Sequence, residues 1–230
     1  GSIRSLEMGE EIHAEVRKKG LLEKEIVLGT SLVDMYSKCG NLQDACAVFA
    51  KFPRKNVILW NTIITGYLEH NHGEEVLSTL EEMQVKGINP DRISYMSALR
   101  ACSDLLALEE GRRFHSVIAE KGFDVHLSIK NTLIDMYGKH GFLHEGKQVF
   151  HSLSDRDMVS WTAMMNAHGS VNDWEMAITC FEEMQREHVK PDGTTFKCLL
   201  NACSHGGLLE EGEQLFNEML HVYHLNPTLE

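Results

Sequence analysis

Proline is scarce in this chain, at four of 230 residues, while 43% of the residues are apolar and 24% are charged. This balance excludes collagen, Pro-rich linkers and long disordered segments. No run of 18 apolar residues occurs, so the sequence predicts no membrane-spanning helix. The six cysteines form no C-x-x-C pair and are too few for a disulfide scaffold. We therefore expect a globular chain whose cysteines are reduced and behave as small hydrophobes.

A signal segment is also absent from the start of the sequence. The chain opens with Gly1-Ser2, which we interpret as a tag remnant. We therefore expect a piece of a longer protein, in which a targeting segment would lie outside this sequence.

Basic residues are fewer than acidic ones, 22 against 34, which gives a formal net charge of −12. This charge argues against non-specific binding of polyanions, because contacts with phosphates need local positive charge. It leaves open a basic stripe on one face of an acidic body.

An internal repeat of 101 residues organises the chain. The segment L-V-D-M-Y-S-K-C-G-N-L from Leu32 returns as L-I-D-M-Y-G-K-H-G-F-L from Leu133. At the same offset Trp60 maps to Trp161, and the blocks E-E-M-Q, P-D, A-C-S and L-E-E-G each recur. A register that holds over so many blocks indicates a tandem duplication.

Each copy divides into three hairpins of 31, 35 and 35 residues. A partial hairpin at 1–25 comes first, and residues 229–230 begin the next one. The predicted hairpins lie between them, at 26–56, 57–91, 92–126, 127–157, 158–192 and 193–228.

The periodicity inside a hairpin is helical, as in the apolar stripe of Leu32, Met35 and Tyr36. Gly40 predicts a helix C-terminus and Asn41 the N-cap of the next helix, which Pro53 closes. Hairpins that cannot bury their apolar faces alone must stack. The sequence therefore predicts an all-α fold, an α-solenoid of about thirteen helices that forms a right-handed superhelix.

Tetratricopeptide repeats are the alternative, but the segment after Trp60 fails their W-x2-L-G-x2-Y pattern, and the hairpin lengths are mixed. The motifs instead resemble those of plant pentatricopeptide repeat (PPR) proteins of the PLS subclass. The S motif, N-x-L-I-D-M-Y-x-K-C-G-x-L, is matched at Thr30–Leu42 and Asn131–Leu143. The P motif is matched at Val57–Asp91 and Met158–Asp192, and the L motif at Leu99–Gly122 and again from Leu200. The resemblance covers residues 3–230, and the last hairpins look like those that precede the C-terminal extension of editing factors.

The resemblance implies binding of single-stranded RNA, one base per hairpin, with the N-terminus of the chain at the 5′ end. The fifth and last residues of each motif would read the base. The pairs, in order, are Thr30 with Asn56, Asn61 with Asp91, Met96 with His126, Asn131 with Asp157, Thr162 with Asp192, and Lys197 with Thr228. The family pattern gives adenine, uracil, no assignment, uracil, guanine and no assignment, with cytosine as second choice at the Asn/Asp pairs.

The second residue of each motif would flank the base, and two lysines at the thirteenth position, Lys38 and Lys139, would contact phosphates. The flanking residues are Val27, Ile58, Ile93, Ser128, Val159 and Thr194. The alternative is that the apolar members are ordinary hydrophobic residues at helix starts. We expect the acidic residues to lie on the second helix of each hairpin, and RNA affinity of this piece alone to be weak.

Signals for an enzyme are weak. His13-Ala14-Glu15 matches half of a deaminase motif, but P-C-x-x-C is absent, and His115 repeats the histidine as a motif residue. His221 with His224, and His70 with His72, lack a third metal ligand. We expect no catalysis, metal or cofactor in this chain.

The resemblance thus favours sequence-specific RNA binding in a mitochondrion or chloroplast, serving C-to-U editing by a deaminase domain or partner. The alternative is a protein-interaction scaffold within an editing complex. We also expect fraying or self-association at the ends, through exposed Leu6, Met8, Ile12 and Val16 at one end and Leu215, Met219 and Leu220 at the other.

Overall fold

The computed structural model describes residues 3–20, 25–52 and 54–227, and this part of the chain is all helical. It contains thirteen α-helices and one 3₁₀ turn, and no strand occurs within these ranges. The predicted all-α fold of about thirteen helices is confirmed. None of these helices combines the length and apolarity needed to cross a bilayer.

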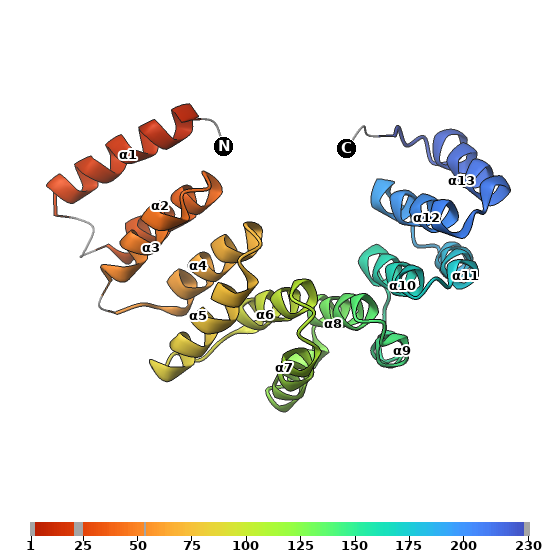
Figure 1. The fold of residues 1–230 in the computed structure, drawn as a ribbon, viewed down its shortest axis with the longest axis horizontal. Helices are drawn as coiled ribbons and strands as arrows, with labels where there is room; N and C mark the ends of the chain where they lie inside the picture. The colour runs from red at the N-terminus through yellow and green to blue at the C-terminus, as the bar shows by residue number, and fades with distance from the viewer. Residues whose placement is uncertain (1–2, 21–24, 53, 228–230) are drawn as a thin grey trace. The chain divides into compact units, whose positions relative to one another are not determined.

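The helices are short and evenly spaced along the chain (Figure 1). Their bounds are α1 Ile3–Lys18, α2 Ile26–Lys38, α3 Leu42–Ala50, α4 Val57–Glu69, α5 Gly73–Val85, α6 Arg92–Asp104, α7 Leu108–Glu120, α8 Leu127–Lys139, α9 Leu143–His151, α10 Met158–Ser170, α11 Trp174–Arg186, α12 Gly193–Gly206 and α13 Leu209–His221, with the 3₁₀ turn η1 at Phe123–Val125.

The even-numbered helices from α2 to α12 begin at the first residues of the predicted hairpins, and we call them the first helices. The odd-numbered helices are called the second helices. Each helix from α2 to α7 has a counterpart that begins 101 residues later, so the sequence repeat is also a repeat of helix boundaries. The assignment of S, P and L motif types stays a prediction.

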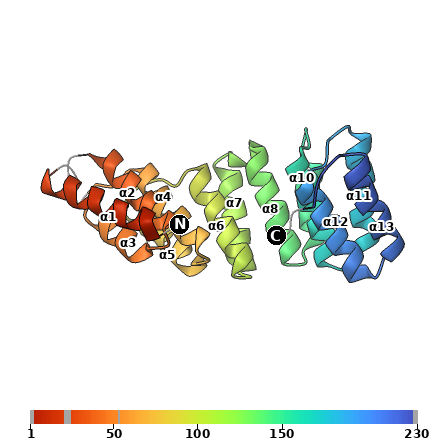
Figure 2. The ribbon, with the colours of Figure 1, turned by 90° about the horizontal axis from the view of Figure 1, so that it is seen from above.

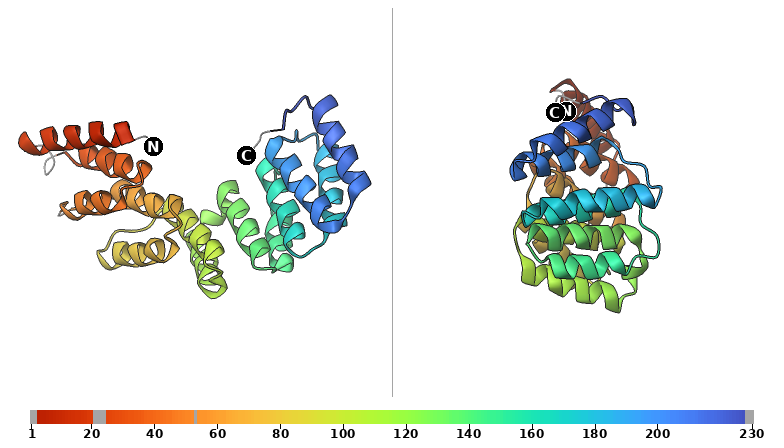
Figure 3. Two further views of the ribbon diagram at one scale, coloured as in Figure 1. Left: turned by 45° about the horizontal axis from the view of Figure 1, so that its top comes forward. Right: turned by 90° about the vertical axis from the view of Figure 1, so that its right-hand side faces the viewer.

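The chain forms two compact units, Gly1–Leu105 and Leu106–Glu230. In the first unit α2, α4 and α6 pack in order, and α3 and α5 each contact two of them. In the second unit α8, α10 and α12 pack in order, and α9 and α11 again bridge two first helices. The neighbouring first helices run alongside one another within each unit (Figures 2 and 3). Each unit thus has a layer of first helices backed by a layer of second helices.

Local signals place the helix ends where they were expected. Gly40 and Gly87 adopt left-handed conformations, with φ of 80° and 74°. The Asn41 side chain accepts a hydrogen bond from the Asp44 amide, as an N-cap should. Pro53 lies outside the described residues. None of the six cysteines forms a disulfide, as predicted.

One tryptophan in each unit anchors the contact between two successive hairpins. Trp60 and Trp161 are 0% and 1% exposed. Their rings meet Phe49 and Phe150 edge to face, at centroid distances of 4.8 Å and 4.9 Å. Such pairs add about 0.5–1.5 kcal/mol beyond the burial of their area. The duplicated sequence thus produces a duplicated core contact.

Two first helices cross closely at a glycine in each unit, but a different helix of the pair carries the glycine in the two units. In the first unit, a β-carbon on Gly66 would collide with Ser37, whereas in the second the glycine is Gly138 and its neighbour is Ala167. These four positions correspond at the offset of 101 residues. Each unit therefore keeps one glycine at this crossing, but on the opposite helix.

The same exchange occurs where a first helix ends. Gly73 lies against Leu105, so that a β-carbon there would be 2.9 Å from the leucine side chain. At the corresponding positions of the second unit, Trp174 lies against Gly206, with 2.6 Å from such a β-carbon to the indole. A large residue thus faces a glycine in both units, with the roles reversed.

The prediction of an exposed apolar face at the C-terminal end is wrong for two of its residues. Leu215 and Met219 are buried, because α13 turns them toward α12. Leu220 is half-buried. At the other end, Met8 and Ile12 are exposed as expected, while Leu6 and Val16 are half-buried.

Candidate functional site

The predicted base-reading pair Asn61 and Asp91 is brought together at the N-terminal ends of α4 and α6. Asn61 Nδ2 donates to Asp91 Oδ1 at 2.9 Å, and Ser94 Oγ donates to Asn61 Oδ1 at 2.6 Å. Ser94 also forms a capping box with Asp91, which begins α6. The three side chains hold one another, so the amide plane of Asn61 has a defined orientation.

The second unit repeats this triad with Asn131, Asp157 and Ser160. Asn131 Nδ2 donates to Asp157 Oδ1 at 3.1 Å, and Ser160 Oγ donates to Asn131 Oδ1 at 2.8 Å. Burial favours a raised pKa for Asp157, but its hydrogen bonds from Ser160 and Asn131 outweigh that effect and lower the pKa. The carboxylate is therefore held in its charged, accepting form.

Thr162 and Asp192 are linked through a third residue. Thr195 Oγ1 donates to Asp192 Oδ1 at 3.1 Å and lies 3.2 Å from Thr162 Oγ1. The Thr162 hydroxyl donates its own proton to the Met158 carbonyl at 2.8 Å. Its oxygen is thus left as an acceptor.

The remaining predicted pairs are less connected. The Thr30 hydroxyl donates to the Ile26 carbonyl at 2.8 Å, and the exposed Asn56 accepts from the Leu59 amide at 2.9 Å. Met96 is half-buried on α6, and His126 is exposed at the N-cap of α8. Lys197 is exposed on α12, and Thr228 lies outside the described residues.

The predicted flanking residues lie in the first turns of the first helices, and the four apolar ones are exposed. Val27 is 69% exposed, Ile58 65%, Ile93 48% and Val159 49%. Thr194 is exposed and Ser128 is half-buried. A hydrophobic side chain that only started a helix would gain stability by burial, so exposure at this recurring position favours a contact with something outside the chain.

Each of the two predicted phosphate-binding lysines forms an ion pair one helical turn back along its helix. Lys38 Nζ lies 2.8 Å from Asp34 Oδ2, and Lys139 Nζ lies 3.2 Å from Asp135 Oδ2. The lysine side chains are 65% and 48% exposed, so water screens both pairs and the ammonium groups remain accessible.

Charge divides between the helix layers as expected. The first helices carry six basic and four acidic residues, whereas the second helices carry seven basic and twenty acidic ones. The net charge of −12 therefore arises on the second helices, and the first helices form the less acidic layer.

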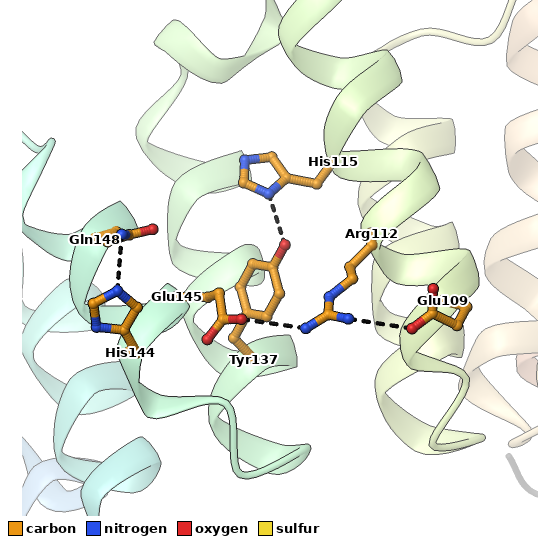
Figure 4. A network of polar contacts seen from close by, with 7 residues as sticks. All are labelled: Glu109, Arg112, His115, Tyr137, His144, Glu145 and Gln148. Atoms are coloured by element: carbon orange, nitrogen blue, oxygen red, sulfur yellow. Dashed lines mark hydrogen bonds and ion pairs between the residues drawn. The ribbon is translucent and has the colours of Figure 1, made fainter.

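The histidines of the deaminase-like motif make hydrogen bonds between helices. His13 Nδ1 lies 2.9 Å from the Tyr36 hydroxyl, and His115 Nδ1 lies 2.8 Å from that of Tyr137. Burial lowers the pKa of both histidines. Figure 4 shows His115 on α7 reaching Tyr137 on α8. These contacts give both histidines a structural role.

Beside His115, an arginine side chain makes two further polar contacts (Figure 4). Arg112 on α7 contacts Glu109 of its own helix and Glu145 on α9, each at 3.2 Å. This side of the second unit is therefore a set of interhelical contacts. Across the described ranges, no three His, Cys, Asp or Glu side chains group as metal ligands.

Sequence reasoning missed Ser94, Ser160 and Thr195, which complete the triads. All three occupy the third position of a predicted hairpin, three residues after the Asp N-cap. The Asp-x-x-Ser/Thr spacing is a capping signal and could have identified them. Its second role, orienting the predicted base-reading residue of the previous hairpin, requires the packing of adjacent first helices.

Comparison with known proteins follows the same repeat. The family model described as "PPR repeat family" matches residues 55–104 and 156–205, and that described as "PPR repeat" matches 30–57, 129–158 and 194–221. The pentatricopeptide repeat-containing protein CRR2, chloroplastic, of Arabidopsis thaliana is 36% identical over all of this chain and 35% of its own length. A second chloroplastic relative from Arabidopsis thaliana, At4g25270, is 36% identical over all of this chain and 42% of its length. The chain thus spans about two fifths or less of these relatives.

Solved structures with low identity share the fold. Pentatricopeptide repeat protein PPR10, solved in complex with an 18-nt psaJ RNA element, gives a TM-score of 0.58 at 16% identity, over 99% of this chain and 39% of that one. A tetratricopeptide repeat protein from Parabacteroides merdae gives 0.63 at 16% identity, over 92% and 89%. At such identities the likeness concerns the helical-hairpin architecture alone.

Proposed function

The chain belongs to the pentatricopeptide repeat family, and from this premise we propose that it binds single-stranded RNA in a sequence-specific manner. The recurring triads at the ends of adjacent first helices carry the proposal, because each fixes polar groups at the same motif positions beside exposed apolar side chains. Such a row can stack a base between flanking residues and read its edge with a held amide or hydroxyl.

The hydrogen-bond inventory supports different bases at the two kinds of triad. In Asn131, one Nδ2 proton and one Oδ1 lone pair are engaged within the triad, so one donor and one acceptor remain for a base. Uracil presents both kinds of group on its edge. Thr162 offers an acceptor beside the Asp192 carboxylate, which suits the donor groups of guanine. The proposed register is 5′-A-U-x-U-G-x-3′, where x is unassigned at the L hairpins.

A substitution at Thr162 tests the register. Thr162→Asn would recreate the Asn–Asp–hydroxyl triad with Asp192 and Thr195, so the fifth base should shift from guanine toward uracil. The change in discrimination should be about 1–3 kcal/mol, the scale of a base-edge contact. Selection from a randomised six-base RNA pool at low salt measures it. If the variant selects the same fifth base as the parent, the register or the polarity is wrong.

The wider role that we propose is guidance of C-to-U editing in a chloroplast or mitochondrion. It is supported by the PLS-type motifs of the sequence and by relatives named as chloroplastic. In this role a deaminase domain or partner would supply the chemistry. Sequencing RNA that co-purifies with the full-length protein, and measuring C-to-U conversion at the bound sites with and without it, tests this role.

A protein-interaction scaffold is the second candidate. The acidic layer of second helices favours it, since twenty carboxylates on one layer suit a basic protein partner. An RNA-binding array should show base preference and should lose affinity for RNA as the salt concentration rises. A scaffold should instead lose affinity for its protein partner when the charges of the second helices are reversed. A competition experiment between RNA and that protein partner would show whether the two bind the same helix layer.

A further inference from the structure

A cavity of about 500 Å³ opens in the second unit, away from the predicted base-reading row. It is lined by the C-terminal halves of α8, α10 and α12 and by the first residue of α11. Its volume lies in the range of small-molecule sites. The polar and aromatic lining residues are Asp135, Lys139, Asn166, Ser170, Asn172, Trp174, Asn201 and His205.

A stacked aromatic pair forms one wall of this cavity. The rings of Trp174 and His205 are 5.8 Å apart and inclined by 20°. The indole is positioned by two glycines, since a β-carbon on Gly206 would lie 2.6 Å from it and one on Gly169 would lie 3.6 Å from it. Trp174 is half-buried, so the indole is fixed by packing while part of it stays accessible.

The polar groups of the cavity are largely uncharged. Three exposed asparagines, Asn166, Asn172 and Asn201, contribute amide donors and acceptors. The two charged residues, Asp135 and Lys139, form an ion pair at 3.2 Å and cancel one another. The ion pair leaves Lys139 exposed for its predicted phosphate contact, while the rest of the lining is neutral. A flat ring with donors and acceptors at its edge, such as a nucleobase, fits both the aromatic wall and the amides.

The first unit lacks this chemistry at the corresponding positions. Asp34 and Lys38 correspond to the ion pair, but Gly73 and Asp104 replace the aromatic pair. Arg100 takes the place of Asn201. The cavity is therefore a specific property of the second unit and does not follow from the repeat itself.

We propose that this cavity binds a nucleobase, namely the base that faces the last hairpin, 193–228. The base-reading pair of that hairpin, Lys197 and Thr228, has no assigned base, while its first helix supplies Asn201 and His205 to the cavity. The inference rests on the proposed RNA binding for the source of the base. Binding of a free nucleoside in the cavity does not require RNA binding.

Tryptophan fluorescence isolates the cavity, because Trp60 and Trp161 are buried and Trp174 is the accessible indole. Titration with adenosine, cytidine, guanosine and uridine should give saturable quenching by at least one nucleoside, and ribose 5-phosphate should give none. His205→Ala and Asn201→Ala should each weaken this binding about fivefold or more, the scale of a lost stacking or edge contact. His144→Ala, an exposed histidine on α9 outside the cavity, should leave it unchanged. Equal quenching by ribose 5-phosphate, or no effect of the two cavity variants, would overturn the proposal.

An RNA measurement separates the failure of this inference from the failure of RNA binding. Six-base RNA of the proposed register is compared with versions that carry an abasic nucleotide at the third or the sixth position. The sixth-position version should bind about fivefold more weakly, and this difference should vanish in His205→Ala. If no RNA binds, the proposed function fails while nucleoside quenching still supports the cavity. If RNA binds but neither abasic RNA nor nucleosides show an effect, the cavity proposal is wrong.

Discussion

At the scale of the residue, one position carries backbone strain that its counterpart avoids. His188 follows α11 in a left-handed conformation, with φ of 59°, while Gly87 after α5 has φ of 74°. In both cases the next amide closes the helix by bonding five residues back, to Met184 and Met83. A side chain costs about 1–2 kcal/mol in this conformation, whereas glycine adopts it freely.

We therefore expect His188→Gly to raise the free energy of unfolding by about 1 kcal/mol. His188 is exposed, so the substitution removes no packing. Urea denaturation monitored by circular dichroism measures the change. The reverse substitution, Gly87→His, should lower stability by a similar amount, and a neutral result for both would contradict the strain.

A half-buried histidine, His115, makes the second unit sensitive to acid. Burial lowers the pKa of His115 below its ordinary value of 6.5, so the folded chain resists protonation that the unfolded chain accepts. The stability that follows is complete above pH 6.5 and is lost as the pH falls from there toward the folded-state pKa. His13 and His168 also have pKa values lowered by burial and act in the same direction.

Unfolding by urea at pH 7.5 and at pH 5 should show this loss. His115→Gln keeps a hydrogen-bonding side chain near Tyr137 but does not titrate, so it should reduce the difference in unfolding free energy between the two pH values. His144→Gln changes an exposed histidine and serves as the control. An unchanged difference in His115→Gln would mean that other groups govern the acid response.

The residues predicted to read bases could be chosen from the sequence because they occupy fixed places in a repeat. Asn61 and Asp91, or Asn131 and Asp157, lie far apart in the chain but at the ends of one motif. Their hydrogen bonds, and the cavity around Trp174 and His205, could not be predicted, since they depend on the packing of neighbouring helices. His205 stands at the same motif position as Lys139, but its stacking partner comes from another hairpin.

At the scale of the element, the helix boundaries were the most predictable feature. Helical periodicity, caps such as Asn41 and the repeat register are local signals, and the helices follow them. The inward turn of Leu215 and Met219 was not predictable from α13 alone. An amphipathic helix shows which face is apolar, but which neighbour covers that face is a tertiary matter.

The exchange of large and small residues between the units predicts strong energetic coupling. Trp174→Gly should cost about 3–5 kcal/mol by leaving a cavity, and Gly206→Leu should cost about 1–3 kcal/mol or more by overpacking the indole. The double variant recreates the Gly73–Leu105 pair of the first unit and should recover most of both losses. A double-mutant cycle of urea denaturation measures the coupling. Additive losses would show that the two side chains do not share one space.

At the scale of the whole molecule, the separation of charge sets how RNA binding should respond to salt. The first helices carry six basic residues, two of which, Lys38 and Lys139, occupy the predicted phosphate position. Two phosphate contacts with a single strand predict that log K falls with log salt at a slope of about −1.4. This slope is shallow because the remaining charge of the chain lies mostly on the other layer.

Lys139→Ala should reduce that slope by about 0.7 and weaken all RNAs by similar factors, because a phosphate contact carries no sequence information. Lys147→Ala, on the second helix α9, is the matched control and should change neither quantity. Binding isotherms between about 20 and 200 mM salt measure both. A slope much steeper than −1.4 would show that more of the basic residues contact the RNA.

The reversed glycine pairs also bear on how such a gene can change. Recombination between tandem copies can delete or add one copy in register. A deletion that joined the first copy to the second between these positions would set Gly73 against Gly206 and leave a void, while a duplication would set Trp174 against Leu105 and leave no room. Each copy has become compatible with its own neighbours only. Recombinants would therefore fold poorly, which protects the number and the order of the hairpins.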